Sequence, residues 1–408
     1  MAAVGGLDAT ARPKGRGATI WEEYYPLLQP QTNYATLPSN NFFAPEVVSA
    51  YIDGVHAFLV SLFCLSTLSL TGLVLCDLFS FPKVCSTLCH LLWIVSPAVS
   101  AVALRRIVEA HLGNVGSHTS AAAPMWEVPQ WRDLFTCYPR SSLMRLLVLS
   151  YCIPLFCQIA AYTLTAATRM VNPFNRSFVE RAETVFSFGN ADVKDGGLVF
   201  YVFYLVFAGV FWDPIPPARY DFGTALNCKA TGCSWLLLAV VQEIGWSGAL
   251  YPALEIVCGH SAFLASVATG LVWALWHWPF VVAEHCGFIP EGSGYAIVTA
   301  DSFEIVSVLC LFTALLVGAR LTMCWIQGKT SHAIWSSAVY HASHNLFIVS
   351  VFGQLMSPLF EKLAAFPYFS GQASVCLVLT TWFSTCILSQ LFRTPYMKLF
   401  GRKRRYYR

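Results

Sequence analysis

Residues 233–250 read CSWLLLAVVQEIGWSGAL and place a carboxylate inside an apolar segment. The segment approaches the ~20 apolar residues that a helix needs to span the hydrocarbon core of a bilayer. Gln242 and Glu243 lie near its middle. An ionisable side chain at that depth is unfavourable unless it is paired or hydrated, so it marks a functional site by default. The stretch therefore predicts a transmembrane helix that carries a functional glutamate.

The composition places this helix in a polytopic membrane protein. Of the 408 residues, 56% are hydrophobic and only 12% are charged, whereas soluble domains average about 25% charged residues. A bilayer accepts apolar surface directly, so we predict an all-α transmembrane helix bundle of about eight spans, eight to nine, each near 20 residues. The candidate spans are residues 55–79, 84–104, 143–168, 198–212, 233–250, 261–283, 303–325, 333–351 and 373–392, of which 198–212 is short.

Polar segments flank the predicted membrane domain. We expect residues 1–52 to form a polar N-terminal segment, 53–392 the transmembrane domain with a motif core at 233–350, and 393–408 a basic tail. The tail holds seven Lys or Arg and no acidic residue, which predicts a cytoplasmic C-terminus.

Residues 105–142, with Trp126 and Trp131, predict a segment at the membrane interface. No basic stripe with interleaved aromatics is present, so the lipid bilayer and not nucleic acid is the expected partner.

Two other apolar segments also carry polar residues. His277 lies within 261–283, and His341, His344 and Asn345 lie within 333–351. His341 and Asn345 are four residues apart, so on a helix they share one face and can point at the same spot. His344 lies to one side of that row and is expected to support it.

Together these residue types are those that peptide-bond hydrolysis requires. A carboxylate or imidazole must take a proton from water, a partner must orient that base, and hydrogen-bond donors must stabilise the oxyanion. One glutamate, histidines and an asparagine on separate spans provide such a set. Gly245 and Gly248 beside the glutamate allow close approach of a neighbouring helix.

The three segments resemble the motifs of one family, the CAAX protease and bacteriocin-processing (CPBP) family of intramembrane proteases. Residues 242–248, Gln-Glu-Ile-Gly-Trp-Ser-Gly, are similar to its Glu-Glu-x-x-x-Arg motif. Trp273 and His277 are similar to its Phe-x-x-x-His motif, and His341 with Asn345 match its His-x-x-x-Asn motif. Ser96-Pro97-Ala98 resembles a further recurring feature, and the similarity covers roughly residues 85–350.

The resemblance implies both a fold and an activity. It implies about eight helical spans around a hydrated conical cavity, and cleavage like that of the type II endopeptidase, which removes the last three residues from prenylated CAAX proteins. By the same resemblance, His277 helps to position the water, and His341 with Asn345 stabilises the oxyanion. The expected substrate is a prenylated or membrane-embedded protein. The residues expected to line the substrate or to support these groups are Trp246, Ser247, Trp273 and His344.

The first motif departs from the family at two positions. Gln242 occupies the position of the general base, and Ser247 replaces the arginine. A neutral amide cannot accept the proton, so we hypothesise that Glu243, with no arginine to neutralise it, turns toward the cavity and acts as the base. Because Glu243 points about 100° away from Gln242 on an ideal helix, this hypothesis requires a local distortion or a different position for the water.

The departure leaves other interpretations open. A catalytically inactive relative could serve as a membrane scaffold or chaperone for prenylated or membrane-embedded partners, whereas a transporter should show paired, broken spans that are not evident. Zinc could be held by Glu243, His277 and His341, but the chain has no HExxH and an asparagine suits oxyanion binding better, so we predict no metal cofactor. The cysteine content and the polar N-terminal segment suggest the endoplasmic reticulum or another endomembrane.

Overall fold

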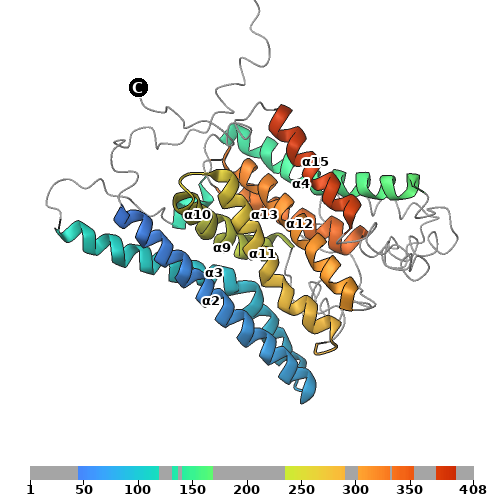
Figure 1. The fold of residues 1–408 in the computed structure, drawn as a ribbon, viewed down its shortest axis with the longest axis horizontal. Coiled ribbons are helices and arrows are strands. Elements are labelled where there is room, and N and C mark those ends of the chain that lie inside the picture. Colours follow the sequence, from blue (N-terminus) through green and yellow to red (C-terminus); the bar gives the residue numbers. More distant parts are fainter. Residues whose placement is uncertain are drawn as a thin grey trace, which may run out of the picture.

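The computed structural model describes residues 45–118, 131–136, 140–168, 235–289, 302–330, 333–352 and 374–391, and these form an all-α bundle without strands. The predicted fold class is confirmed. In Figure 1, α2 and α3 lie side by side along one flank, α4 and α15 lie at the other, and α9 to α13 lie between them. The elements are α2 (Pro45–Leu78), α3 (Lys83–His118), the 3₁₀ helix η2 (Trp131–Phe135), α4 (Arg140–Ala167), α9 (Trp235–Gly245), the π-helix η5 (Trp246–Leu250), α10 (Tyr251–Val257), α11 (Ala262–His285), α12 (Ser302–Gln327), α13 (Trp335–His344), the π-helix η6 (Asn345–Phe352) and α15 (Val375–Leu391).

Five of the helices are long and apolar enough to cross a membrane, within the part of the chain that the structure describes. They are Pro45–Leu78, Lys83–Gly113, Leu143–Ala167, Ala262–His285 and Ile305–Gln327. The predicted spans 233–250 and 333–351 are mostly helical as well. In each of them an α-helix is followed directly by a π-helix. The predicted span 198–212, the basic tail 393–408 and Trp126 lie outside the described residues.

The bounds of two helices differ from the sequence prediction. α2 begins at Pro45, inside the segment expected to be polar, because proline suits the first turn of a helix and Glu46 complements the helix dipole there. α3 continues through Arg105 to His118, where we expected the span to end at residue 104. The prediction ended the span at residue 104 because polar residues follow. Polar residues limit the part of a helix that lies in the bilayer, but the helix itself can continue beyond it.

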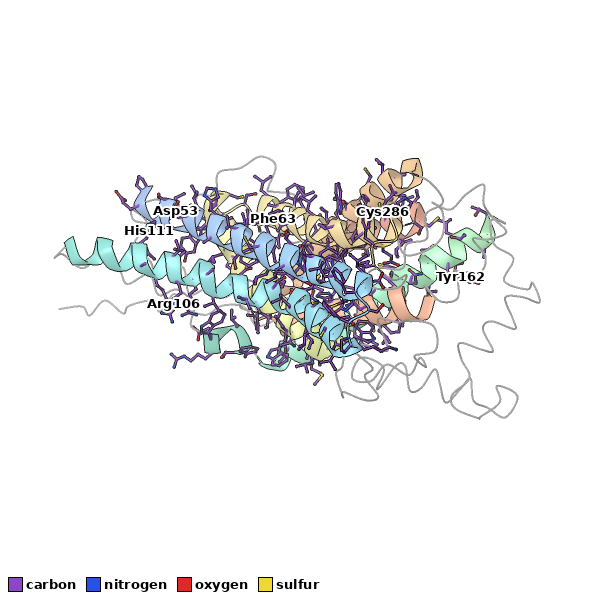
Figure 2. All side chains as sticks on the ribbon, turned by 90° about the horizontal axis from the view of Figure 1, so that it is seen from below. Asp53, Phe63, Arg106, His111, Tyr162 and Cys286 are labelled. Carbon is purple, nitrogen blue, oxygen red and sulfur yellow. The ribbon has the colours of Figure 1, made fainter. Side chains whose placement is uncertain are left out.

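The hairpin of α2 and α3 has an apolar outer face. Phe63 on α2 is 72% exposed and points away from the bundle, as Figure 2 shows. At the far end of the same hairpin, Asp53 and His111 come together with 3.3 Å between Oδ2 and Nδ1. An apolar middle with a polar pair at one end fits a hairpin whose outer face contacts lipid.

Glycine lets α9 approach α3 backbone to backbone. A Cβ atom added to Gly245 would lie 2.4 Å from the carbonyl carbon and oxygen of Pro97, and one added to Gly248 would lie 2.9 Å from Leu134 Cδ1. The close approach predicted from these two glycines is therefore confirmed, and Gly245 makes it at the Ser-Pro-Ala segment of α3.

Prolines inside the helices free backbone carbonyls that other helices use. Pro97 has no N–H, so the carbonyl of Trp93 loses its helical partner. The hydroxyl of Ser96 donates to that carbonyl at 2.7 Å and accepts from Trp276 Nε1 of α11 at 3.2 Å. A serine–proline pair thereby links α3 to α11.

Pro154 has the same effect in α4. It leaves the carbonyl of Ser150 free, and Ser343 Oγ of α13 donates to this carbonyl at 3.2 Å. α15 packs on α4 and α12, and Thr380 Oγ1 donates to Cys157 O of α4 at 3.0 Å. These contacts fix the helix that carries His341 against the outer helices.

Gly245→Ala should destabilise the fold, because the added methyl group meets backbone that cannot rotate away. We expect a loss of about 1–3 kcal/mol in the free energy of unfolding, as for other overpacked sites, measured by denaturant titration in mixed micelles. Gly113→Ala is the matched control, since nothing lies within 4 Å of its added Cβ. Equal stability of the two variants would contradict the backbone contact.

Candidate active site

Glu243 is fully buried and faces the other helices of the bundle. It lies in the last turn of α9 with a side-chain exposure of 0%. Arg320, also 0% exposed, reaches it from α12 and donates from Nη1 to Oε2 at 2.8 Å and from Nη2 to Oε1 at 3.2 Å. This two-pronged geometry is the strong form of a carboxylate–guanidinium pair.

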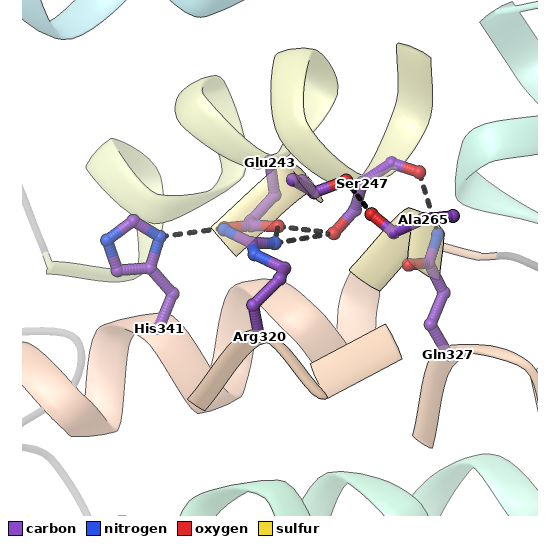
Figure 3. A network of polar contacts seen from close by, with 7 residues as sticks. Glu243, Ser247, Ala265, Arg320, Gln327 and His341 are labelled. Atoms are coloured by element: carbon purple, nitrogen blue, oxygen red, sulfur yellow. Dashed lines mark hydrogen bonds and ion pairs between the residues drawn. The ribbon is translucent and has the colours of Figure 1, made fainter. Parts of the chain in front are cut away.

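Two more side chains complete the coordination of the carboxylate (Figure 3). Ser247 Oγ, one turn along the same chain, donates to Oε2 and accepts from Arg320 Nη1 at 3.2 Å. His341 of α13 places Nδ1 2.9 Å from Oε1. A carboxylate held by a guanidinium is ionised and can only accept hydrogen bonds, so we infer that Nδ1 of His341 carries a proton.

The hypothesis that no arginine neutralises Glu243 is therefore wrong. The motif places its arginine at position 247, whereas the arginine that binds Glu243 is Arg320, 73 residues further along the chain. The signal was present, because Arg320 is the one charged residue between Ile305 and Gln327, and charged groups inside spans are functional suspects.

The indole ring of Trp273 on α11 packs against both Arg320 and His341. The Arg320 Cζ lies 4.5 Å from the centre of its ring, a cation–π contact. His341 meets the same ring edge-on at 5.0 Å between centroids, and His277 and His344 lie at 6.2 and 6.5 Å. The indole therefore contacts histidines from two of the predicted segments, and Glu243 of the third joins the group through its bonds to Arg320 and His341.

His277 lies in largely aromatic surroundings. Its ring is 4.6 Å from that of Trp276, 5.4 Å from Trp93 and 5.6 Å from Phe312. Trp246 belongs to the same aromatic region, since it is fully buried and contacts Phe58 and Trp276 at 5.9 and 5.5 Å. These contacts hold the imidazole at a fixed position beside the Glu243 cluster.

The remaining predicted residues border this cluster. Gln242 is 8% exposed, and within the described residues its Oε1 has no hydrogen-bond partner. His344 is buried, and its Nε2 likewise lacks a partner among the residues that the structure describes. Asn345 is half-buried and begins η6, and its backbone N–H bonds to the carbonyls of His341 and Ala342.

Two of the three motif segments change from α-helix to π-helix at the site. After Glu243, η5 carries the bond from Tyr251 N–H to Trp246 O. The next bond in this register would need an N–H from Pro252, which proline lacks, and Gln327 Nε2 of α12 donates to Ser247 O at 2.8 Å instead. π-helical turns occur often at functional sites. A distortion was predicted here, and it lies just after Glu243.

The close approach of α11 and α12 brings Arg320 to this point. A Cβ atom added to Gly270 would lie 2.8 Å from the Cα of Val317 and 3.3 Å from the Cβ of Arg320. Gly270 stands one turn before Trp273, so the missing side chain lets the arginine reach across the indole.

The zinc alternative finds no set of ligands in this arrangement. Glu243, His277 and His341 are all described, yet the described chain contains no group of three His, Cys, Asp or Glu side chains placed to hold a metal ion. Both oxygens of Glu243 bind the guanidinium of Arg320, and a divalent cation would have to displace that cation. Among the described residues, these three side chains are therefore not arranged as the ligand set that the zinc alternative requires.

Comparisons with known proteins support the resemblance in the motifs. Residues 226–347 match the family model described as type II CAAX prenyl endopeptidase Rce1-like, and this range holds Glu243, His277, Arg320 and His341. No curated protein and no solved structure matches the chain.

Arg320→Met should destabilise the protein strongly, because it leaves the Glu243 carboxylate buried without its cation. Breaking a buried pair from one side costs about 3–5 kcal/mol, and we expect a loss of that size in the free energy of unfolding. Arg105→Met is the control, since the Arg105–Glu109 pair is an arginine–glutamate pair with a single contact of 2.7 Å and is partly exposed, and such pairs contribute about 0–1 kcal/mol. Equal losses for both variants would contradict a structural role for the Glu243–Arg320 pair.

Proposed function

The chain belongs to the CAAX protease and bacteriocin-processing family, to which its type II CAAX prenyl endopeptidase match assigns it, and on that premise we propose that it is an active intramembrane endopeptidase. The proposed reaction is hydrolysis of a peptide bond in a prenylated CAAX protein or another membrane-associated protein. Glu243, His277, His341 and Asn345 are the residues proposed to carry it.

One observation carries this proposal: the Glu243–His341 hydrogen bond of 2.9 Å, made beside Trp273, whose ring centre lies 6.2 Å from that of His277. A carboxylate paired with an imidazole is the arrangement that orients a catalytic base in many hydrolases. Buried charged groups are unfavourable in lipid and are not required for helix packing, so their presence favours a functional site.

The remaining groups are of the type that the oxyanion needs. Asn345 is the first residue of η6 and lies one turn after His341. The N–H of its side-chain amide is a suitable donor to a developing negative charge. The neutral amide of Gln242 offers the same donor chemistry, although it cannot accept a proton. We therefore propose that these two amides, with His277, line the position of the substrate carbonyl in a hydrated cavity.

A second function is favoured by a specific observation. Gln242 stands where the family has its base, and Arg320 neutralises Glu243 through both of its oxygens. A site with no free carboxylate could bind a prenylated or membrane-embedded partner without cleaving it, as a scaffold or chaperone. The same polar cluster would then serve recognition and stability.

No metal cofactor is part of the proposed mechanism. The proposed groups move the proton and stabilise the oxyanion without one, and the ligand set for zinc does not fit the contacts of Glu243. We expect cleavage to continue undiminished after incubation with a strong chelator. A loss of activity that zinc restores would contradict this mechanism.

The protein is an integral membrane protein, and we propose the endoplasmic reticulum or another endomembrane as its location. The basic tail 393–408 is proposed to lie in the cytoplasm by the positive-inside tendency.

The purified protein in lipid nanodiscs should cleave a farnesylated peptide that ends in a CAAX sequence, with release of the last three residues measured by mass spectrometry. Glu243→Gln should lower the rate by about 10²–10⁴-fold, the range of a general acid–base contribution. Glu109→Gln on the exposed pair is the control and should cleave normally.

The same assay separates the two functions. If the native chain binds the peptide without cleaving it, and Gln242→Glu creates activity, the scaffold function is correct and the endopeptidase proposal is wrong.

A further inference from the structure

The contacts of His341 point to a different role from the one the family resemblance implies. Resting on the proposed hydrolysis, we propose that His341, oriented by Glu243, is the base that takes the proton from the attacking water. Glu243 and Arg320 are then positioning residues, and Glu243 is not itself the proton acceptor.

The contacts of Glu243 define which nitrogen of the His341 imidazole carries the proton. Glu243 accepts hydrogen bonds from Arg320 at both oxygens and from Ser247 at one of them. It therefore needs a donor at the remaining contact, which is His341 Nδ1. A neutral imidazole with its proton on Nδ1 has a free lone pair on Nε2, and this lone pair is the acceptor that a water molecule requires.

The second step concerns the oxyanion. A neutral His341 in this tautomer has no N–H on Nε2, so it cannot donate a hydrogen bond to a substrate carbonyl from that nitrogen. Its Nδ1–H is already given to Glu243. The role of oxyanion donor then passes to other side chains, of which Asn345 and Gln242 carry amide N–H groups.

The third step concerns the carboxylate. Glu243 is fully buried, and the bidentate pair with Arg320 stabilises its charged form. Taking a proton would weaken those bonds and leave the guanidinium buried without a full counter-charge. Protonation of His341 breaks no such bonds, and it places the new positive charge beside the Glu243 carboxylate.

The resulting step conserves atoms and electrons. As the water oxygen bonds to the scissile carbonyl carbon, its proton moves to Nε2 of His341 and the carbonyl π electrons move to oxygen. The tetrahedral intermediate then collapses, the C–N bond breaks, and the leaving nitrogen takes the proton from His341. The products are a carboxylic acid and an amine, and the imidazole returns to its neutral state.

The kinetic test uses a substitution that separates a base from a donor. His341→Gln keeps a hydrogen-bond donor but removes the basic nitrogen. We expect kcat to fall by at least about 10²-fold while KM changes by less than about threefold. His90→Gln, on a buried histidine of α3 whose Nδ1 lies 3.0 Å from Ser86 O, is the matched control and should retain full activity. Activity retained in His341→Gln would overturn the assignment.

The positioning role has a spectroscopic test that needs no substrate. In protein labelled with ¹⁵N-histidine, the ring signals assigned to His341 by their loss in His341→Gln should report the Nδ1–H tautomer. Glu243→Gln should shift them toward the Nε2–H tautomer, since an amide can donate where the carboxylate could only accept. Native protein with the proton on Nε2 would overturn the proposal.

The two tests also distinguish this inference from the proposed function. Cleavage by the native protein together with an active His341→Gln variant refutes the base assignment alone. Absence of cleavage by the native protein, with activity created by Gln242→Glu, refutes both, even if the tautomer is as expected.

Discussion

The structure depends on the pairing of a buried carboxylate with a buried guanidinium. Glu243 and Arg320 are each fully buried, and neither would be tolerated inside a membrane bundle alone. Because the pair joins α9 to α12, and Glu243 also binds His341 of α13, it fixes the register of three helices. Trp273 adds α11 by packing against both Arg320 and His341. The same contacts that stabilise the bundle therefore define the geometry of the site.

The position of the arginine explains how two departures from the family motif coexist. Ser247 stands where the motif has an arginine, and its small hydroxyl donates to the same carboxylate that Arg320 holds. An arginine at both positions would place two guanidinium groups around one carboxylate. In this chain the guanidinium that pairs with Glu243 comes from another helix, α12. Because Glu243 is paired with Arg320, it does not replace the carboxylate that Gln242 lacks. The imidazoles are then the remaining candidates for the base.

Sequence reasoning identified the convergence of the motifs but not the charge balance. His277, His341 and Glu243 were identifiable because polar groups inside apolar segments are conspicuous. The structure places the two histidines around Trp273 and bonds Glu243 to His341. Arg320 satisfied the same criterion and was missed because the motif directed the search to position 247. The start of α2 at Pro45 was missed for a different reason, since hydropathy locates the apolar core of a span and not the polar turns that precede it. Which nitrogen of His341 faces the carboxylate depends on three-dimensional packing, so no pattern in the sequence could reveal it.

Irregular backbone explains how such a site can exist in an apolar bundle. Pro97, Pro154 and Pro252 each remove one backbone donor, and each freed carbonyl accepts from a side chain: Ser96, Ser343 and Gln327 respectively. Two of these donors come from another helix, so the defect in one helix becomes a polar link to its neighbour. The π-turn after Glu243 belongs to the same set, because Gln327 of α12 replaces the bond that Pro252 cannot make. Arg320 and Gln327, two turns apart on α12, therefore bind Glu243 of α9 and Ser247 of η5, so the position of α12 sets the geometry of the site.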